Sequence, residues 1–125
     1  MPRDPYPLLP LKPVVFQILL LLADGDRHGW SLVRDLQDRT GGGRLLPGNF
    51  YRILKAAIDE GLVEEKTPSK AVRERAEADT GANAERRRYV GLTTFGREVA
   101  KAEAARLADL VAESRSKRLI PARPR

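Results

Sequence analysis

One stretch near the middle of the chain has apolar residues three and four positions apart, as on one face of a helix. Pro47 and Gly48 open this stretch and Gly61 closes it, so the pattern predicts a helix of three to four turns over residues 47–60. Its apolar face comprises Phe50, Ile53, Leu54, Ala57 and Ile58. Its polar face comprises Asn49, Arg52 and Lys55, with Tyr51 at the edge and a late acid at Asp59. A cationic, hydrogen-bonding helix face suits the major groove of DNA, and the alternative is a surface helix with a solvated polar face.

Two more helices are predicted before this stretch. Residues 13–23 are apolar nearly all round, which predicts a helix that is buried on more than one side. In so small a protein, a helix that needs cover on several sides indicates a second subunit. The next helix is predicted from His28 or Gly29 to Arg39, where three glycines follow and end it. Its inward positions are predicted to be Trp30, Val33 and Leu36.

Two short strands are predicted after the 47–60 helix. Residues 61–66 are typical of a turn into a strand, and residues 86–92 form a second strand, in which Tyr89 and Val90 favour extended geometry. The stretch between them, residues 67–85, is charged and rich in alanine, and it is predicted to be a loop. Two strands joined by a long loop after a pair of helices are typical of a winged helix.

A last amphipathic helix is predicted from Phe95 to about Arg118, with Thr93 or Thr94 as its N-terminal cap. Its apolar stripe comprises Val99, Ala102, Leu107, Leu110 and Val111. A long amphipathic helix at the end of a small domain usually packs on its own domain and on a symmetry mate. This helix therefore predicts a homodimer.

The elements together predict a mainly α (α+β) fold: a winged helix-turn-helix with a two-stranded wing and a long C-terminal dimerisation helix. The predicted divisions are a flexible, proline-rich arm over residues 1–10, a winged-helix DNA-binding domain over 11–93, the dimerisation helix over 94–118 and a basic tail over 119–125.

Charge and composition narrow the class of function. A net charge of +6 with a pI near 10.1 indicates a polyanionic partner. The chain has no cysteine and a single histidine, which exclude disulfides and thiolate metal sites and leave little for acid–base chemistry. With no phosphate-binding glycine loop either, neither an enzyme activity nor a metal or cofactor is expected. The apolar stretch 13–23 lacks a cleavage pattern and is half the length of a membrane span, which predicts a cytoplasmic protein and no membrane partner.

Four motifs in this order resemble those of the PadR-type transcriptional regulators. They are the His-Gly-aromatic opening of a helix at residues 28–32, the Pro-Gly-x-x-Tyr-x-x-Leu helix at 47–54, the Gly-Leu-aliphatic entry to the wing at 61–63, and the basic-aromatic strand with its Leu-Thr-x-x-Gly helix start at 86–96. The resemblance covers residues 11–112. It implies a dimeric winged-helix repressor, similar to the small subfamily that dimerises through one last helix with help from the first. The chain departs from the family at Leu46, where members often have a serine cap, and in having no tryptophan in its last helix.

The helix pattern and the resemblance together select the expected contact residues. Those expected to contact a palindromic double-stranded DNA operator are Asn49, Tyr51, Arg52, Lys55, Arg86, Arg87 and Arg88. Those expected at the dimer interface are Phe16, Leu19, Val99, Leu107, Leu110 and Val111. A small-molecule effector, if there is one, is expected between the last helices of the dimer. The alternative function is a winged-helix protein-interaction module whose basic face docks an acidic partner.

Overall fold

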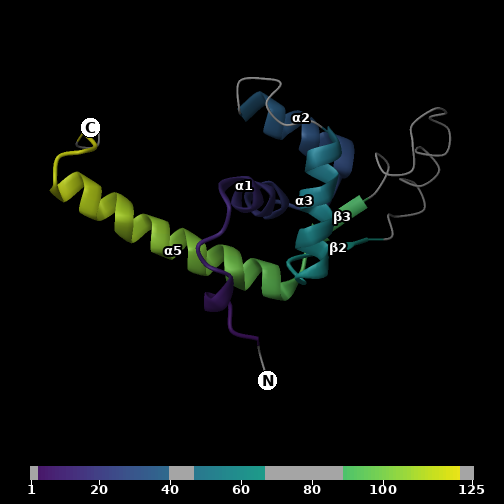
Figure 1. Ribbon diagram of the computed structural model, residues 1–125, viewed down its shortest axis with the longest axis horizontal. Coiled ribbons are helices and arrows are strands. Elements are labelled where there is room, and N and C mark those ends of the chain that lie inside the picture. The colour runs from purple at the N-terminus through teal and green to yellow at the C-terminus, as the bar shows by residue number, and fades with distance from the viewer. Residues whose placement is uncertain (1–2, 40–46, 67–88, 122–125) are drawn as a thin grey trace.

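The computed structural model describes residues 3–39, 47–66 and 89–121. A body of three helices and a small sheet sits at one end of the molecule, and a long last helix runs past it (Figure 1). The elements are η1 (Tyr6–Leu8), α1 (Pro13–Leu22), β1 (Arg27–His28), α2 (Gly29–Arg39), α3 (Pro47–Asp59), β2 (Val63–Glu65), β3 (Tyr89–Leu92) and α5 (Thr94–Ser116). The predicted glycine link and the predicted wing loop lie outside the described residues. The fold is a winged helix-turn-helix with a long C-terminal helix, which confirms the predicted fold class.

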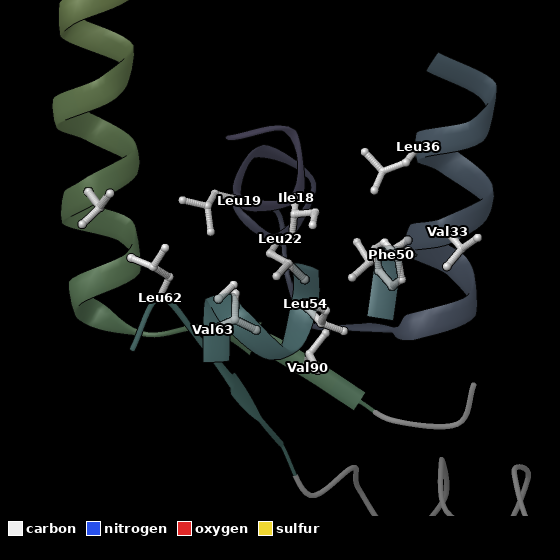
Figure 2. Packing of buried hydrophobic residues seen from close by; sticks show 13 residues of the cluster. Ile18, Leu19, Leu22, Val33, Leu36, Phe50, Leu54, Leu62, Val63 and Val90 are labelled. Carbon is white, nitrogen blue, oxygen red and sulfur yellow. The ribbon is translucent and has the colours of Figure 1, made fainter. Parts of the chain in front are cut away.

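The core lies where α1, α2, α3 and the strands meet, with α1 at its centre (Figure 2). The fully or almost fully buried side chains are Ile18, Leu19 and Leu22 of α1, Leu32, Val33 and Leu36 of α2, Phe50, Leu54 and Ala57 of α3, Leu62, Val63, Val90, and Val99 of α5. The apolar face predicted for α3 therefore faces the core. Of the helices in the described part of the chain, none is both long enough and apolar enough to cross a membrane.

The sheet has three strands in the order β1-β3-β2, all antiparallel, where the sequence predicted two. The additional strand, β1, consists of Arg27 and His28, which pair with Val90 and Tyr89. Two residues are too short to show an alternating pattern, so β1 is recognisable only from its partner strand. The Arg27 guanidinium also donates hydrogen bonds to Ser31 and Asp35, which join β1 to α2.

Trp30 corrects the prediction for α2. It was expected to point inward, but its side chain is 44% exposed, and the guanidinium of Arg34 lies 4.8 Å from its ring centroid. At about 100° per residue, the buried stripe of α2 is centred between Leu32 and Val33, and Trp30 lies well to one side of it. The predicted inward positions were three residues apart. This spacing selected Val33 and Leu36 correctly and missed Leu32.

The start of α5 is attached to the entrance of β2. Thr93 is the N-cap, and its hydroxyl accepts a hydrogen bond from the Gly96 N–H at 2.8 Å and donates to the Gly61 carbonyl. Gly96 packs directly on the Leu62 carbonyl, and a Cβ built at Gly96 would lie 1.9 Å from that oxygen. The Leu-Thr-x-x-Gly motif thus provides both a helix cap and a close contact between backbones.

The described part of the segment before α1, for which the sequence predicted a flexible arm, packs against the body. It contains the single 3-10 turn η1, and Leu8, Leu9 and Leu11 pack on the core. Arg3 donates a hydrogen bond to the Glu60 carbonyl at 2.8 Å, and its guanidinium lies 4.4 Å from the ring centroid of Phe95. The segment therefore contacts both the end of α3 and the start of α5.

A buried carboxylate holds the other end of this segment. Glu103 of α5 is 1% exposed and accepts the Leu11 N–H at 2.8 Å and two guanidinium N–H groups of Arg106. The hydrogen bond from Arg106 lowers the pKa of Glu103, the Leu11 N–H adds to this, and burial opposes it. Glu103 is charged because its oxygens have partners, as a buried carboxylate requires.

Acidification is expected to remove the stabilisation that Glu103 provides. Its pKa in the folded chain lies below the ordinary value of 4.5, so its contribution is present above that pH and is lost as the pH falls through the folded pKa. Urea unfolding of the unmutated chain and of Glu103→Gln, from pH 7 to pH ~3, should give a stability difference that shrinks below pH 4.5. A difference that stays constant over this range would contradict the assignment. Glu98→Gln, which changes an exposed carboxylate of the same helix, is the control.

Candidate nucleic-acid interface

The exposed face of α3 points directly away from the core. Arg52 is two residues from both Phe50 and Leu54, so at about 100° per residue it lies roughly 160° around the helix from each. Asn49 and Lys55 flank it, and all three are exposed. The structure thus brings together the three residues of the polar face that the sequence selected for groove contact.

Arg52 and Lys55 differ in their electrostatic surroundings. Lys55 Nζ lies 3.3 Å from Asp59 Oδ2, an exposed pair one turn apart that offsets part of its charge. Arg52 has no hydrogen-bond or ion-pair partner among the described residues. Arg52 therefore offers a planar set of donors at the centre of this face, and no described residue compensates its charge.

Tyr51 occupies the edge of the face, as predicted, but it is half-buried. Its ring meets the ring of Phe50 edge-on, and the two ring centroids lie 5.1 Å apart, within the range of about 4.5–7 Å found for such pairs. This contact ties Tyr51 to the core side of α3. Tyr51 also packs against the buried core, so the tyrosine helps to hold α3 on the body.

The wing is described in part. Arg86, Arg87 and Arg88 lie outside the described residues, so their expected contacts stay predictions. At the base of the wing, Lys66 Nζ lies 2.8 Å from Glu64 Oε1, and this hydrogen bond raises the pKa of the lysine. The exposed acids Glu64 and Glu65 make the described base of the wing less basic than α3.

The residues expected at the dimer interface divide into two groups. Leu19 and Val99 are fully buried in the core of the chain itself, so neither has surface left for a partner or for an effector between two copies. Phe16 and Leu107 are half-buried, whereas Leu110 and Val111 are 47% and 37% exposed. The reason is length: α5 has 23 residues and is about 35 Å long, so its last turns extend beyond the body (Figure 1).

The side of α5 that is buried near the start of the helix is exposed near its end. Gly96, Glu103 and Leu110 follow one another at two-turn intervals and so lie on the same side of the helix. The first two are buried against the body, and Leu110 is exposed because the body ends before it. The apolar stripe predicted for α5 is thus covered over its first half and left uncovered over its second.

The first helix has an uncovered apolar face as well. Leu20 is 42% exposed and lies one turn from Phe16, so the two side chains are on the same side of α1. Sequence reasoning selected Leu19 and missed Leu20, because a helix that is apolar all round does not show which side the body covers. The structure therefore places Phe16 and Leu20, rather than Leu19, on the outer face of α1.

Comparison with known proteins shows the family and supports the fold. Residues 18–102 match the family described as the transcriptional regulator PadR-like family. No curated protein matches the chain. The fold is similar to that of a PadR family transcription regulator from Clostridium difficile, at 16% identity and a TM-score of 0.62 over 84% of this chain and 97% of that one. It is also similar to a PadR-like transcriptional regulator from Bacillus cereus, at 17% identity and a TM-score of 0.63 over 87% and 93%.

A third solved structure extends the likeness to H. salinarum RosR, at 20% identity and a TM-score of 0.56 over 88% of this chain and 98% of that one. At these identities the structures establish the fold alone. The family match covers more than half of the chain, including α2, α3, the strands and the first turns of α5. The chain belongs to the PadR-like family of transcriptional regulators.

Proposed function

We propose that this chain is a homodimeric, sequence-specific DNA-binding repressor. The observation that carries the proposal is the exposed face of α3. There Asn49 and Lys55 flank Arg52, whose guanidinium has no partner among the described residues. A helix of this kind, backed by a winged-helix body, fits the major groove. Arginine and asparagine there form paired hydrogen bonds with guanine and adenine edges. We refer to α3 as the recognition helix.

The proposed dimer forms through the uncovered apolar faces of α1 and α5. Phe16 and Leu20 on α1, with Leu107, Leu110 and Val111 on α5, offer the apolar area that a second copy would bury. A two-fold dimer presents two recognition helices to successive major grooves, roughly 34 Å apart, of a palindromic operator. A dimer bound across a promoter would repress by blocking access to it.

Replacing Arg52 by alanine is expected to weaken operator binding by about 1–3 kcal/mol, because the variant loses a paired contact to a base edge or a phosphate. Fluorescence anisotropy with a selected operator at fixed salt measures the change. Lys101→Ala is the matched control, since Lys101 is an exposed cation on α5 whose partner is Glu98. Equal affinity for Arg52→Ala and the unmutated chain would remove Arg52 from the interface.

The function itself is tested by selecting binding sites from a random DNA library at two salt concentrations. Enrichment of a palindromic sequence that survives competition by random DNA is the expected result, with affinity that falls steeply as salt rises. Binding equal to that of random DNA and lost with salt would overturn the proposal. That result would favour the alternative, in which the same cationic face docks an acidic protein.

A further inference from the structure

The direction in which α5 leaves the body is set at two points. The first is its start, where Thr93 caps the helix and Gly96 packs on the Leu62 carbonyl. The second is two turns later, where Glu103 accepts the Leu11 N–H. Two points fix the direction of a rod, and the second point lies on the segment that leads into α1.

Glu103 supplies the directional part of the second attachment. Apolar packing between α1 and α5 resists separation but tolerates sliding and tilting, because the hydrophobic effect has no preferred direction. The hydrogen bond from Leu11 N to Glu103 Oε2 is 2.8 Å long and requires a defined geometry. Glu103 is also the one charged side chain buried in the described part of the chain. Its loss leaves the part-buried Leu11 N–H without this acceptor.

A small change at Glu103 would be enlarged along α5. From Gly96 to Glu103 the helix rises about 10 Å, and from Glu103 to Ser116 it rises about 20 Å more. A 1 Å displacement at Glu103 therefore becomes a displacement of about 3 Å at the free end. The half-buried Leu107 and the exposed Leu110 and Val111 all lie beyond Glu103 along α5. The tilt of α5 therefore decides how two bodies are oriented across a dimer.

We propose that Glu103 is a positioning residue that sets the separation of the two recognition helices, and hence the operator half-site spacing that the dimer prefers. The inference rests on the proposed homodimer and on DNA binding by α3. It assigns to Glu103 a role in specificity, although the side chain is buried and lies on a different helix from α3.

Four variants separate this role from a general loss of stability. Glu103→Met removes the acceptor and fills its space, and Glu103→Ala removes the acceptor without filling it, so one of them serves if the other fails to fold. Glu103→Gln keeps an oxygen that can accept the Leu11 N–H and is the rescue variant. Glu98→Gln removes an exposed carboxylate from the same helix and is the matched control.

The first measurement is the distance between the two recognition helices without DNA. The chain has no cysteine, so Ala56→Cys on the exposed side of α3 gives one spin label per copy. Double electron–electron resonance should give a narrow distance distribution for the unmutated background, for Glu103→Gln and for Glu98→Gln. The Met and Ala variants should change its mean or its width by a few ångströms, because a tilt of α5 reorients each body relative to the dimer interface.

The second measurement is binding to operators whose half-sites are moved apart in steps of one base pair, or about 3.4 Å. The unmutated dimer should prefer one spacing, and the Met and Ala variants should shift that optimum or reduce its preference at least several-fold. Their affinity for a single half-site should stay unchanged. If the Met and Ala variants keep the unmutated distance between recognition helices and the unmutated half-site spacing, the inference is overturned and the proposed function is not. An unmutated chain that gives no inter-subunit distance, or no selective DNA binding, would overturn the proposed function and the inference with it.

Discussion

Replacing Gly96 by alanine is expected to lower the free energy of unfolding by about 3 kcal/mol, with a fall in melting temperature of ~10 °C. The new Cβ would lie 1.9 Å from the Leu62 carbonyl oxygen and 2.8 Å from its carbon. Both atoms belong to the backbone at the entrance of β2, so no flexible side chain can move to make room. The start of α5 would have to shift away from the sheet and lose the Thr93 cap geometry. Thermal and urea unfolding followed by circular dichroism measure the effect.

Gly48→Ala is the control for this prediction. A Cβ at Gly48 of α3 would meet nothing within 4 Å, and alanine favours the helical conformation. Its free energy of unfolding is expected to change by less than about 1 kcal/mol. If Gly96→Ala proved as stable as Gly48→Ala, the close backbone contact between α5 and β2 would be wrong.

Replacing Leu110 by glutamate is expected to abolish the dimer and to reduce operator affinity by about 10²–10⁴-fold. Leu110 is 47% exposed in the single chain, on the line of α5 that continues from buried Gly96 and Glu103. A carboxylate there would have to be desolvated against the partner's apolar face, which costs several kcal/mol. Each recognition helix would then bind alone, without the gain from two linked sites. Sedimentation equilibrium and anisotropy with the full palindrome measure the two losses.

Ala105→Glu is the matched control, because it introduces the same carboxylate on the same helix. Ala105 is exposed and lies about 140° around α5 from Leu110, away from the apolar line. This variant should stay dimeric and bind the operator as the unmutated chain does. Loss of the dimer in both variants, or in neither, would show that the partner does not cover the Leu110 side of α5.

Helices with a clear polar–apolar division were predictable from the sequence. In α3 the spacing of Phe50, Leu54 and Ala57 placed the polar residues on the opposite face, and the structure has them there. Thr93, one of two predicted caps, is the residue that caps α5. These features depend on neighbours within a few residues, so local periodicity and hydrogen-bonding chemistry determine them.

Elements whose own residues do not separate into a polar and an apolar face were not predictable in the same way. Because α1 is apolar on all sides, its pattern did not distinguish the buried Leu19 from the exposed Leu20. The two residues of β1 have no pattern of their own and are a strand because β3 lies beside them. Trp30 has a large apolar side chain of the kind found in protein cores, yet it is exposed. The core covers the neighbouring face of α2, which carries Leu32, Val33 and Leu36.

The sequence by itself determined the helical faces, the cap of α5, the excess of positive charge and the family motifs, since each depends on residues close together along the chain. Only the tertiary structure decided that Arg3 reaches the Glu60 carbonyl and that Leu11 donates to Glu103. The partners in these bonds are 57 and 92 residues apart, and no local pattern marks them. They exist because packing α1 between the recognition helix and α5 brings the first residues of the chain against both. The exposed Arg3 then reaches the end of the recognition helix, and the Leu11 N–H reaches the buried carboxylate of α5, which needs a partner.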